Sequence, residues 1–176
     1  MEILAGPSIE LHPPRPYLAI RQIAPFRGML AVRDALWNEV FGWLEARGLG
    51  ASGKAFLRLN VIDMRGEMDI EAGIVTDEAV AGDDRVRQGT LPGGHYATLT
   101  YRDHSIQANK HLIDWVAGKS REFDRSKDPR GDRFACRYEL NLSDPRSERR
   151  RKHWAVQLCF LTRPRPGATA QGGSNG

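Results

Sequence analysis

Two kinds of hydrophobic pattern alternate along this chain, one with the 3.6-residue repeat of helices and one with the two-residue repeat of strands. The helical repeat predicts helices at about residues 27–46, ended by Gly48, and 106–117. The two-residue alternation predicts strands at 17–23, 55–63, 67–76, 95–101, 134–142 and 154–162. The order strand, helix, strand, strand therefore occurs twice.

The two series match each other as the halves of a duplication. Tyr17-Leu18-Ala19-Ile20 aligns with Tyr96-Ala97-Thr98-Leu99, and Trp43 and Trp115 lie late in their helices. The pattern predicts an α+β domain at residues 1–162, with one module at about 17–76, a second at about 85–162, and antiparallel sheets. The start of the chain, up to about Pro16, is rich in proline and is given no regular element, and the tail at 163–176 is expected to be disordered.

The four predicted hairpin strands have one apolar and one polar face. We assign to the apolar face Leu57, Leu59, Val61, Met68, Ile70, Ile74, Tyr138, Leu140, Leu142, Val156, Leu158 and Phe160, and to the polar face Arg58, Asn60, Asp69, Glu71, Arg137, Glu139, Asn141 and Gln157. The apolar face is expected to pack on the helix of its own half. The polar face either meets water or lines a cleft between the modules, where small-molecule sites tend to lie.

Composition and charge narrow the class of protein. No signal peptide and no membrane-spanning apolar run occurs, and Cys136 and Cys159 are too few for a disulfide framework, so we expect a cytoplasmic protein. The net charge of +4 raises the question of nucleic acid. The basic residues cluster only at Arg146, Arg149, Arg150, Arg151 and Lys152, between two strands, where we predict a solvated turn. With no helix-turn-helix pattern, direct DNA binding is disfavoured.

The histidines and tryptophans add candidates and exclusions. The five histidines show no ligand spacing, so we predict no metal and no cofactor. Trp43 and Trp115 fall on apolar helix faces and are predicted to be core residues. Trp37 is flanked by polar residues and is a candidate pocket wall, and Tyr101 is left as a further candidate.

Three runs stand out in order along the chain: Met68-Asp69-Ile70-Glu71-Ala72-Gly73, Leu91-Pro92-Gly93-Gly94-His95-Tyr96-Ala97 and Glu139-Leu140-Asn141-Leu142-Ser143-Asp144-Pro145. Together they resemble the GyrI-like small-molecule-binding domain, which also forms the effector-binding part of AraC-type and MerR-type regulators. The resemblance covers roughly residues 17–162. It implies duplicated SHS2-type modules about a pseudo-twofold axis, with a planar, aromatic or cationic ligand between them and Glu139 at the centre of the pocket.

The chain departs from the family pattern at a few positions. Asn141 stands where tyrosine is usual, and Gln157 and Phe160 stand where the last strand often has glutamate and proline. Glu139 and Glu71 are then the acidic groups expected in the pocket. Arg137, two positions from Glu139 on the same strand face, is expected to hold that carboxylate ionised.

Three functions follow from this reading. The first is a stand-alone protein that binds a small molecule through Glu139, Glu71, Asn60, Arg137, Asn141, Gln157, Trp37 and Tyr101. The second is a hydrolase that detoxifies a reactive compound, such as a DNA alkylator with a cyclopropane ring, with Glu139 as its acid–base group. The third is a protein that binds gyrase or a regulator through the basic turn around Arg149.

Overall fold

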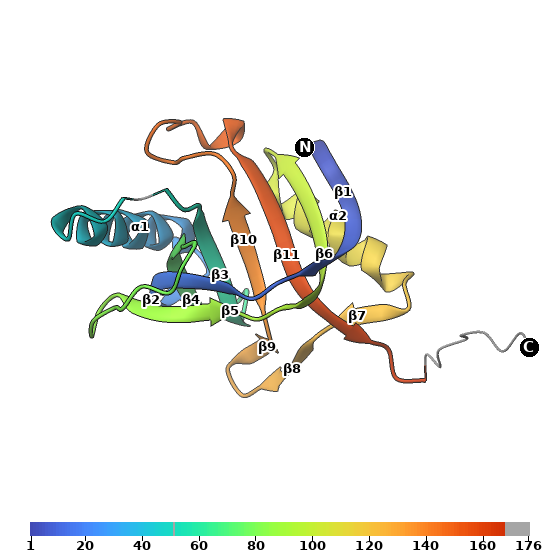
Figure 1. The fold of residues 1–176 in the computed structure, drawn as a ribbon. Helices are drawn as coiled ribbons and strands as arrows, with labels where there is room; N and C mark the ends of the chain where they lie inside the picture. The colour runs from blue at the N-terminus through green and yellow to red at the C-terminus, as the bar shows by residue number, and fades with distance from the viewer. Residues whose placement is uncertain (51, 168–176) are drawn as a thin grey trace, which may run out of the picture.

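The computed structural model describes residues 1–50 and 52–167, which form an α+β fold (Figure 1). The helices are α1 (Met29–Ala46) and α2 (Ser105–Ala117), with a 3-10 turn at Arg151–His153. The strands are β1 (Glu2–His12), β2 (Arg15–Pro25), β3 (Ala55–Ile62), β4 (Glu67–Val75), β5 (Arg87–Leu91), β6 (Gly94–Arg102), β7 (Arg121–Phe123), β8 (Arg125–Asp128), β9 (Gly131–Phe134), β10 (Arg137–Asn141) and β11 (Ala155–Pro164).

The order of the strands in the sheet reflects the two repeated modules. Along the main path the strands run β1-β6-β11-β10-β3-β4-β2-β5. Module one contributes β2, β4 and β3 with α1, and module two contributes β6, β11 and β10 with α2. The equivalent strands β3 and β10 pair antiparallel at the centre, as a twofold axis between the modules requires. The strand before each module crosses to the other one, because β1 pairs with β6 and β5 pairs with β2.

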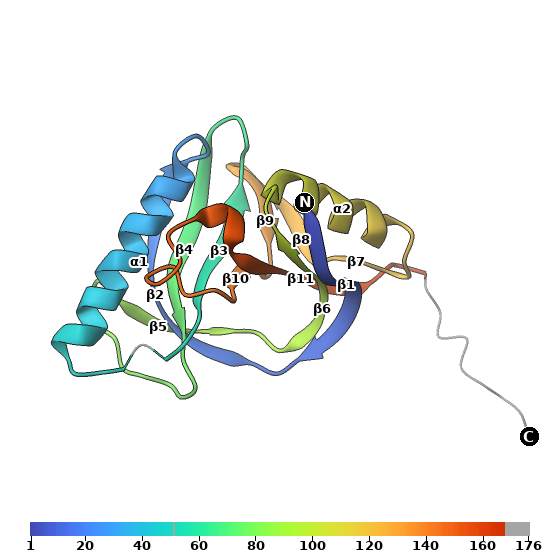
Figure 2. The same cartoon turned by 90° about the horizontal axis from the view of Figure 1, so that it is seen from above.

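Both helices lie on one face of this sheet. Residues directly opposite each other in neighbouring strands point to the same side. One such row runs from Leu57 on β3 through Glu139 on β10 to Leu158 on β11 and Leu99 on β6. Leu57 belongs to the core beneath α1, and Leu158 and Leu99 belong to the core beneath α2. Glu139 therefore faces the space between the two helices, which Figure 2 shows from above.

Helix α1 follows its predicted pattern. Leu36, Val40 and Leu44 recur every four residues and are buried against the sheet. Gly48 adopts a φ of +63°, which favours glycine. Its N–H bonds to the carbonyl of residue 45 and the next N–H, from Leu49, reaches back to Leu44, so the helix ends in a Schellman motif.

The predicted orientation of β10 is wrong. Tyr138 and Leu140 were expected to pack toward α2, but they join Tyr17, Phe56 and Tyr96 in a core on the opposite face of the sheet. The cause is the register with β3, in which Glu139 stands opposite Leu57 rather than opposite a polar residue.

Both ends of the chain contain strand residues that the pattern did not predict. The start of the chain forms the eleven-residue strand β1, which pairs along β6. Strand β11 continues through Pro164, so the first two residues of the expected tail belong to the sheet. Residues 168–176 of that tail lie outside the described residues. Strands β5, β7, β8 and β9 were also not predicted as separate elements.

Candidate ligand-binding cleft

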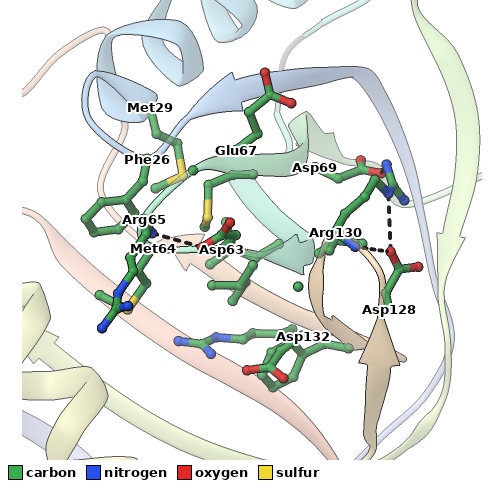
Figure 3. A pocket seen from close by; sticks show the side chains of 18 of the residues that line it. Phe26, Met29, Asp63, Met64, Arg65, Glu67, Asp69, Asp128, Arg130 and Asp132 are labelled. Atoms are coloured by element: carbon green, nitrogen blue, oxygen red, sulfur yellow. Dashed lines mark hydrogen bonds and ion pairs between the residues drawn. The ribbon is translucent and has the colours of Figure 1, made fainter.

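A cleft of about 1240 Å³ opens between the two modules on the helix face of the sheet. Its walls are the start of α1, the turn of the β3–β4 hairpin, the first half of α2 and the β8–β9 hairpin (Figure 3). Glu139 and Arg137 from β10 line it from below. Typical small-molecule sites have volumes of about 300–1000 Å³, so the cleft has room for an organic molecule.

Apolar side chains line much of this cleft, although it is open to solvent. Five of its lining residues are large hydrophobic side chains that are exposed in the free protein: Ile23, Leu30, Met64, Ile106 and Ile113. Met29, Met64 and Met68 also line it, which places three of the four methionines of the chain at one site. Methionine adapts its shape to differing apolar partners, so this lining suits ligands of varied outline.

Charged groups at the rim are largely paired with each other. Asp69 accepts hydrogen bonds from Arg21 at 2.8 and 2.7 Å and lies 3.5 Å from a nitrogen of Arg130. Arg130 also pairs with Asp128 (Figure 3), and Lys127 pairs with another rim carboxylate, that of residue 132. These pairs fix the shape of the rim and leave little net charge there.

Glu139 stands at the centre of the sheet between the helices and remains partly exposed to the cleft. Its pKa is raised above the usual carboxyl value, mainly because burial disfavours the charged form. The positive charges of Arg33 on α1 and Arg137 beside it, and the Asn109 amide on α2, oppose that rise. A partly desolvated carboxylate in a cleft attracts a cation or exchanges a proton more readily than one in water.

Arg137 is held firmly beside Glu139. Its guanidinium lies 4.9 Å from the ring centroid of Phe134 and 4.2 Å from that of Phe160. One of its terminal nitrogens donates to the Asn109 side-chain oxygen at 2.9 Å, which links β10 to α2. Burial lowers the pKa of Arg137 to about 10, so it is still a cation at neutral pH.

Two of the predicted site residues lie on the other face of the sheet. Glu71 accepts hydrogen bonds from the Tyr17 hydroxyl at 3.0 Å and from the Asn60 amide at 3.2 Å, and Arg58 lies 3.7 Å away. This cluster adjoins the core of the opposite face, because Arg58 stands opposite Tyr138 in the β3–β10 register. Glu71 and Asn60 are therefore not brought together with Glu139.

The remaining predicted residues are also outside the cleft. Gln157 stands opposite Leu140 on the face away from the helices. Trp37 belongs to α1, is buried in the core with the sheet, and donates a hydrogen bond from its indole to the Phe56 carbonyl at 2.9 Å. Tyr101 is buried under α2, where burial raises its pKa. Asn141 lies on the helix face, 4% exposed, and neither atom of its amide finds a hydrogen-bond partner among the described residues.

Sequence reasoning missed the apolar wall of the cleft. Phe26 and Met29 lie at the start of α1, and Met64 lies in the β3–β4 turn. In the sequence these positions suggest only the start of a helix and a loop. One feature could have indicated the apolar wall: Met64 is a large apolar residue in the short turn Asp63-Met64-Arg65-Gly66, where it is expected to be exposed.

Several solved structures share this fold. EcmrR in its DNA complex matches with a TM-score of 0.66 at 12% identity, over 89% of this chain and 57% of that chain. The isolated C-terminal domain of EcmrR matches with a TM-score of 0.65 at 12% identity, over 89% and 96%. The chain thus spans little more than half of EcmrR and nearly all of its C-terminal domain.

Two further structures with this fold are named for a bound ligand or an activity. SAV2435 bound to tetraphenylphosphonium matches with a TM-score of 0.52 at 10% identity, over 93% of this chain and 94% of that chain. A hydrolase from Listeria innocua matches with a TM-score of 0.56 at 10% identity, over 89% and 91%. No curated protein sequence matches the chain. The model of the GyrI-like small molecule binding domain matches residues 6–157. The chain belongs to the GyrI-like small molecule binding domain family.

Proposed function

We propose that the protein binds a planar, aromatic and cationic small molecule in the cleft between its modules, with Glu139 as the anionic contact. The observation that carries this proposal is the partly exposed carboxylate of Glu139 at the base of a cleft lined by exposed apolar side chains and three methionines. An exposed apolar patch of this kind marks a binding surface. SAV2435, which has the same fold, is bound to the aromatic cation tetraphenylphosphonium.

The charges of two nearby arginines act on Glu139, and their other partners determine how far they occupy it. Arg33 donates to Asp34 at 3.0 and 2.7 Å, so a second carboxylate shares its charge. Arg137 donates to the Asn109 oxygen and stacks on two phenylalanine rings, and no ion pair joins it to Glu139 among the described residues. A cationic ligand can therefore contact the Glu139 carboxylate, and cation–π contacts of about 0.5–2 kcal/mol each add to the attraction.

Hydrolysis is the second candidate, favoured by the raised pKa of Glu139. A carboxyl group with a raised pKa in a cleft is a candidate acid–base group. Glu71, the second acidic group expected from the sequence, lies on the other face of the sheet and does not line the cleft. A hydrolase built here would therefore have to use Glu139 with a different second group.

A thermal-shift screen coupled to mass spectrometry tests both candidates. Wild type and Glu139→Gln would be screened against planar cationic dyes and cyclopropane-bearing electrophiles. A stabilising compound recovered intact, whose affinity falls at least about tenfold in Glu139→Gln, supports binding. A compound that gains water with wild type alone supports hydrolysis. Equal stabilisation of both proteins would contradict the role of Glu139.

The cell compartment and macromolecular partners belong to the same proposal. No helix in the described residues is long and apolar enough to cross a membrane. Both cysteines are free and buried, which favours the reducing cytoplasm. In the turn between β10 and β11, Arg146, Arg150 and Arg151 pair with nearby carboxylates. This pairing favours a structural role for the turn over binding of DNA, gyrase or a regulator.

A further inference from the structure

Arg33 of α1 lies over two tryptophan rings, one helical turn beyond residues that line the cleft. Its guanidinium carbon lies 4.5 Å from the ring centroid of Trp37 and 5.4 Å from that of Trp154, and the two indole rings are 6.0 Å apart. Arg33 is 6% exposed, so this cation has been taken almost wholly out of water. Cages of this kind are used by proteins to hold cationic ligands.

The cage follows the cleft lining along α1. Met29 and Leu30 line the cleft from the first turn of α1, and Arg33 follows one turn later on the same side of the helix. Trp37 lies one turn further and bonds to the Phe56 carbonyl, at the seam between β3 and β10. Along α1, Arg33 therefore follows the cleft-lining residues and precedes Trp37.

A second observation is a buried amide on β10 close to Glu139 in the chain. Asn141 lies two residues beyond Glu139 on the same face of β10 and is 4% exposed, yet both of its amide atoms lack hydrogen-bond partners in the described part of the chain. Leaving a buried polar group without a partner costs about 1–3 kcal/mol. A polar group of a ligand, or a water molecule that accompanies it, would satisfy this amide.

Given the proposed function, on which this step rests, we propose that Arg33 is an internal competitor that fills the cation site formed by Trp37, Trp154 and Glu139. A cationic aromatic ligand displaces its guanidinium from the tryptophans, and the ligand's charge takes its place. The displaced side chain keeps Asp34 as a partner near the surface. Asp34 is also held by Arg151 of the β10–β11 turn, so its carboxylate stays paired throughout. Arg33 then determines specificity. A ligand displaces it only if the ligand's own cation–π and charge contacts offset those that Arg33 loses.

Arg33→Met tests this proposal, because methionine keeps an apolar stem of similar reach and removes the charge. Ethidium would serve as the cationic probe and the uncharged dye Nile red as the neutral one. We expect the ratio of ethidium to Nile red affinity to rise about tenfold in Arg33→Met, equivalent to about 1.4 kcal/mol. Arg33→Lys, which retains a cation in the cage, is the matched control and should keep the wild-type ratio.

Indole N–H signals in NMR spectra of the wild-type protein give a second measurement that needs no stable variant. Ethidium should shift the signals of Trp37 and Trp154 and leave those of Trp43 and Trp115 unchanged. An unchanged affinity ratio in Arg33→Met, or unmoved Trp37 and Trp154 signals, overturns the role of Arg33. If Glu139→Gln still loses ethidium affinity in that case, the proposed function stands. If neither substitution changes binding, both proposals fail.

Discussion

Ile106, at the mouth of the cleft, offers a test that separates ligand binding from folding. Its side chain, in the first turn of α2, lines the cleft and is 76% exposed in the free protein. Full burial of an isoleucine side chain is worth about 1.5–3 kcal/mol. A ligand that covers the exposed three-quarters gains about 1–2 kcal/mol from it. Ile106→Gln should therefore weaken binding about 5- to 30-fold.

The free protein should be nearly unaffected by the same change. Ile106 contributes little packing before the ligand arrives, so the free energy of unfolding should stay within about 0.5 kcal/mol of wild type. Leu11→Gln is the matched control, because Leu11 is 71% exposed on β1, away from the lining of the cleft. Calorimetric titration with ethidium and thermal unfolding would measure the two effects. Unchanged affinity in Ile106→Gln, or an equal loss in Leu11→Gln, would show that Ile106 makes no specific contact with the ligand.

Three further changes probe the scaffold. Glu139→Gln should stabilise the free protein at pH 7, because the raised pKa of Glu139 means that the folded state disfavours its charge. Wild type should lose stability as the pH rises from 4.5 through the raised pKa of Glu139, because the folded state holds that proton more tightly than the unfolded state. The variant should not show this loss. Urea unfolding across this pH range would measure it. Gly73→Ala should lower the melting temperature by several degrees, since its Cβ would lie 1.9 Å from the Leu18 carbonyl oxygen. Trp154→Phe removes a 2.6 Å hydrogen bond from the indole to the Glu148 carbonyl and should cost about 1 kcal/mol in urea unfolding.

Much of the fold was predictable, because the segments that build each module carry their own periodicity. The helical spacing of residues such as Leu36 and Val40 identified α1, and Gly48 located its end. The apolar face of β3 and β4 was assigned correctly, since Leu57 and Ile70 both pack beneath α1. The outer strand β1 was missed because its partner is β6, some ninety residues away, and such long-range pairing leaves no local pattern.

The site was harder to predict, because it depends on the register between modules. Alternation along β10 shows that Glu139 and Tyr138 face opposite sides, but not which side meets the helices. Pairing with β3 decides this, and it separates Glu139 from Glu71. The family resemblance gave Glu139 its central position. The apolar wall around Met64 and the cation Arg33 came from the three-dimensional arrangement alone.

A crystal structure of the complex with the planar aromatic cation ethidium would show where a ligand binds. We predict that the cation lies on the helix face of the sheet, between α1 and α2, with Glu139 as the nearest carboxylate and Met29, Met64 or Ile106 in contact with its rings. A ligand bound on the opposite face, beside Glu71 and Tyr17, would show that the cleft is not the binding site.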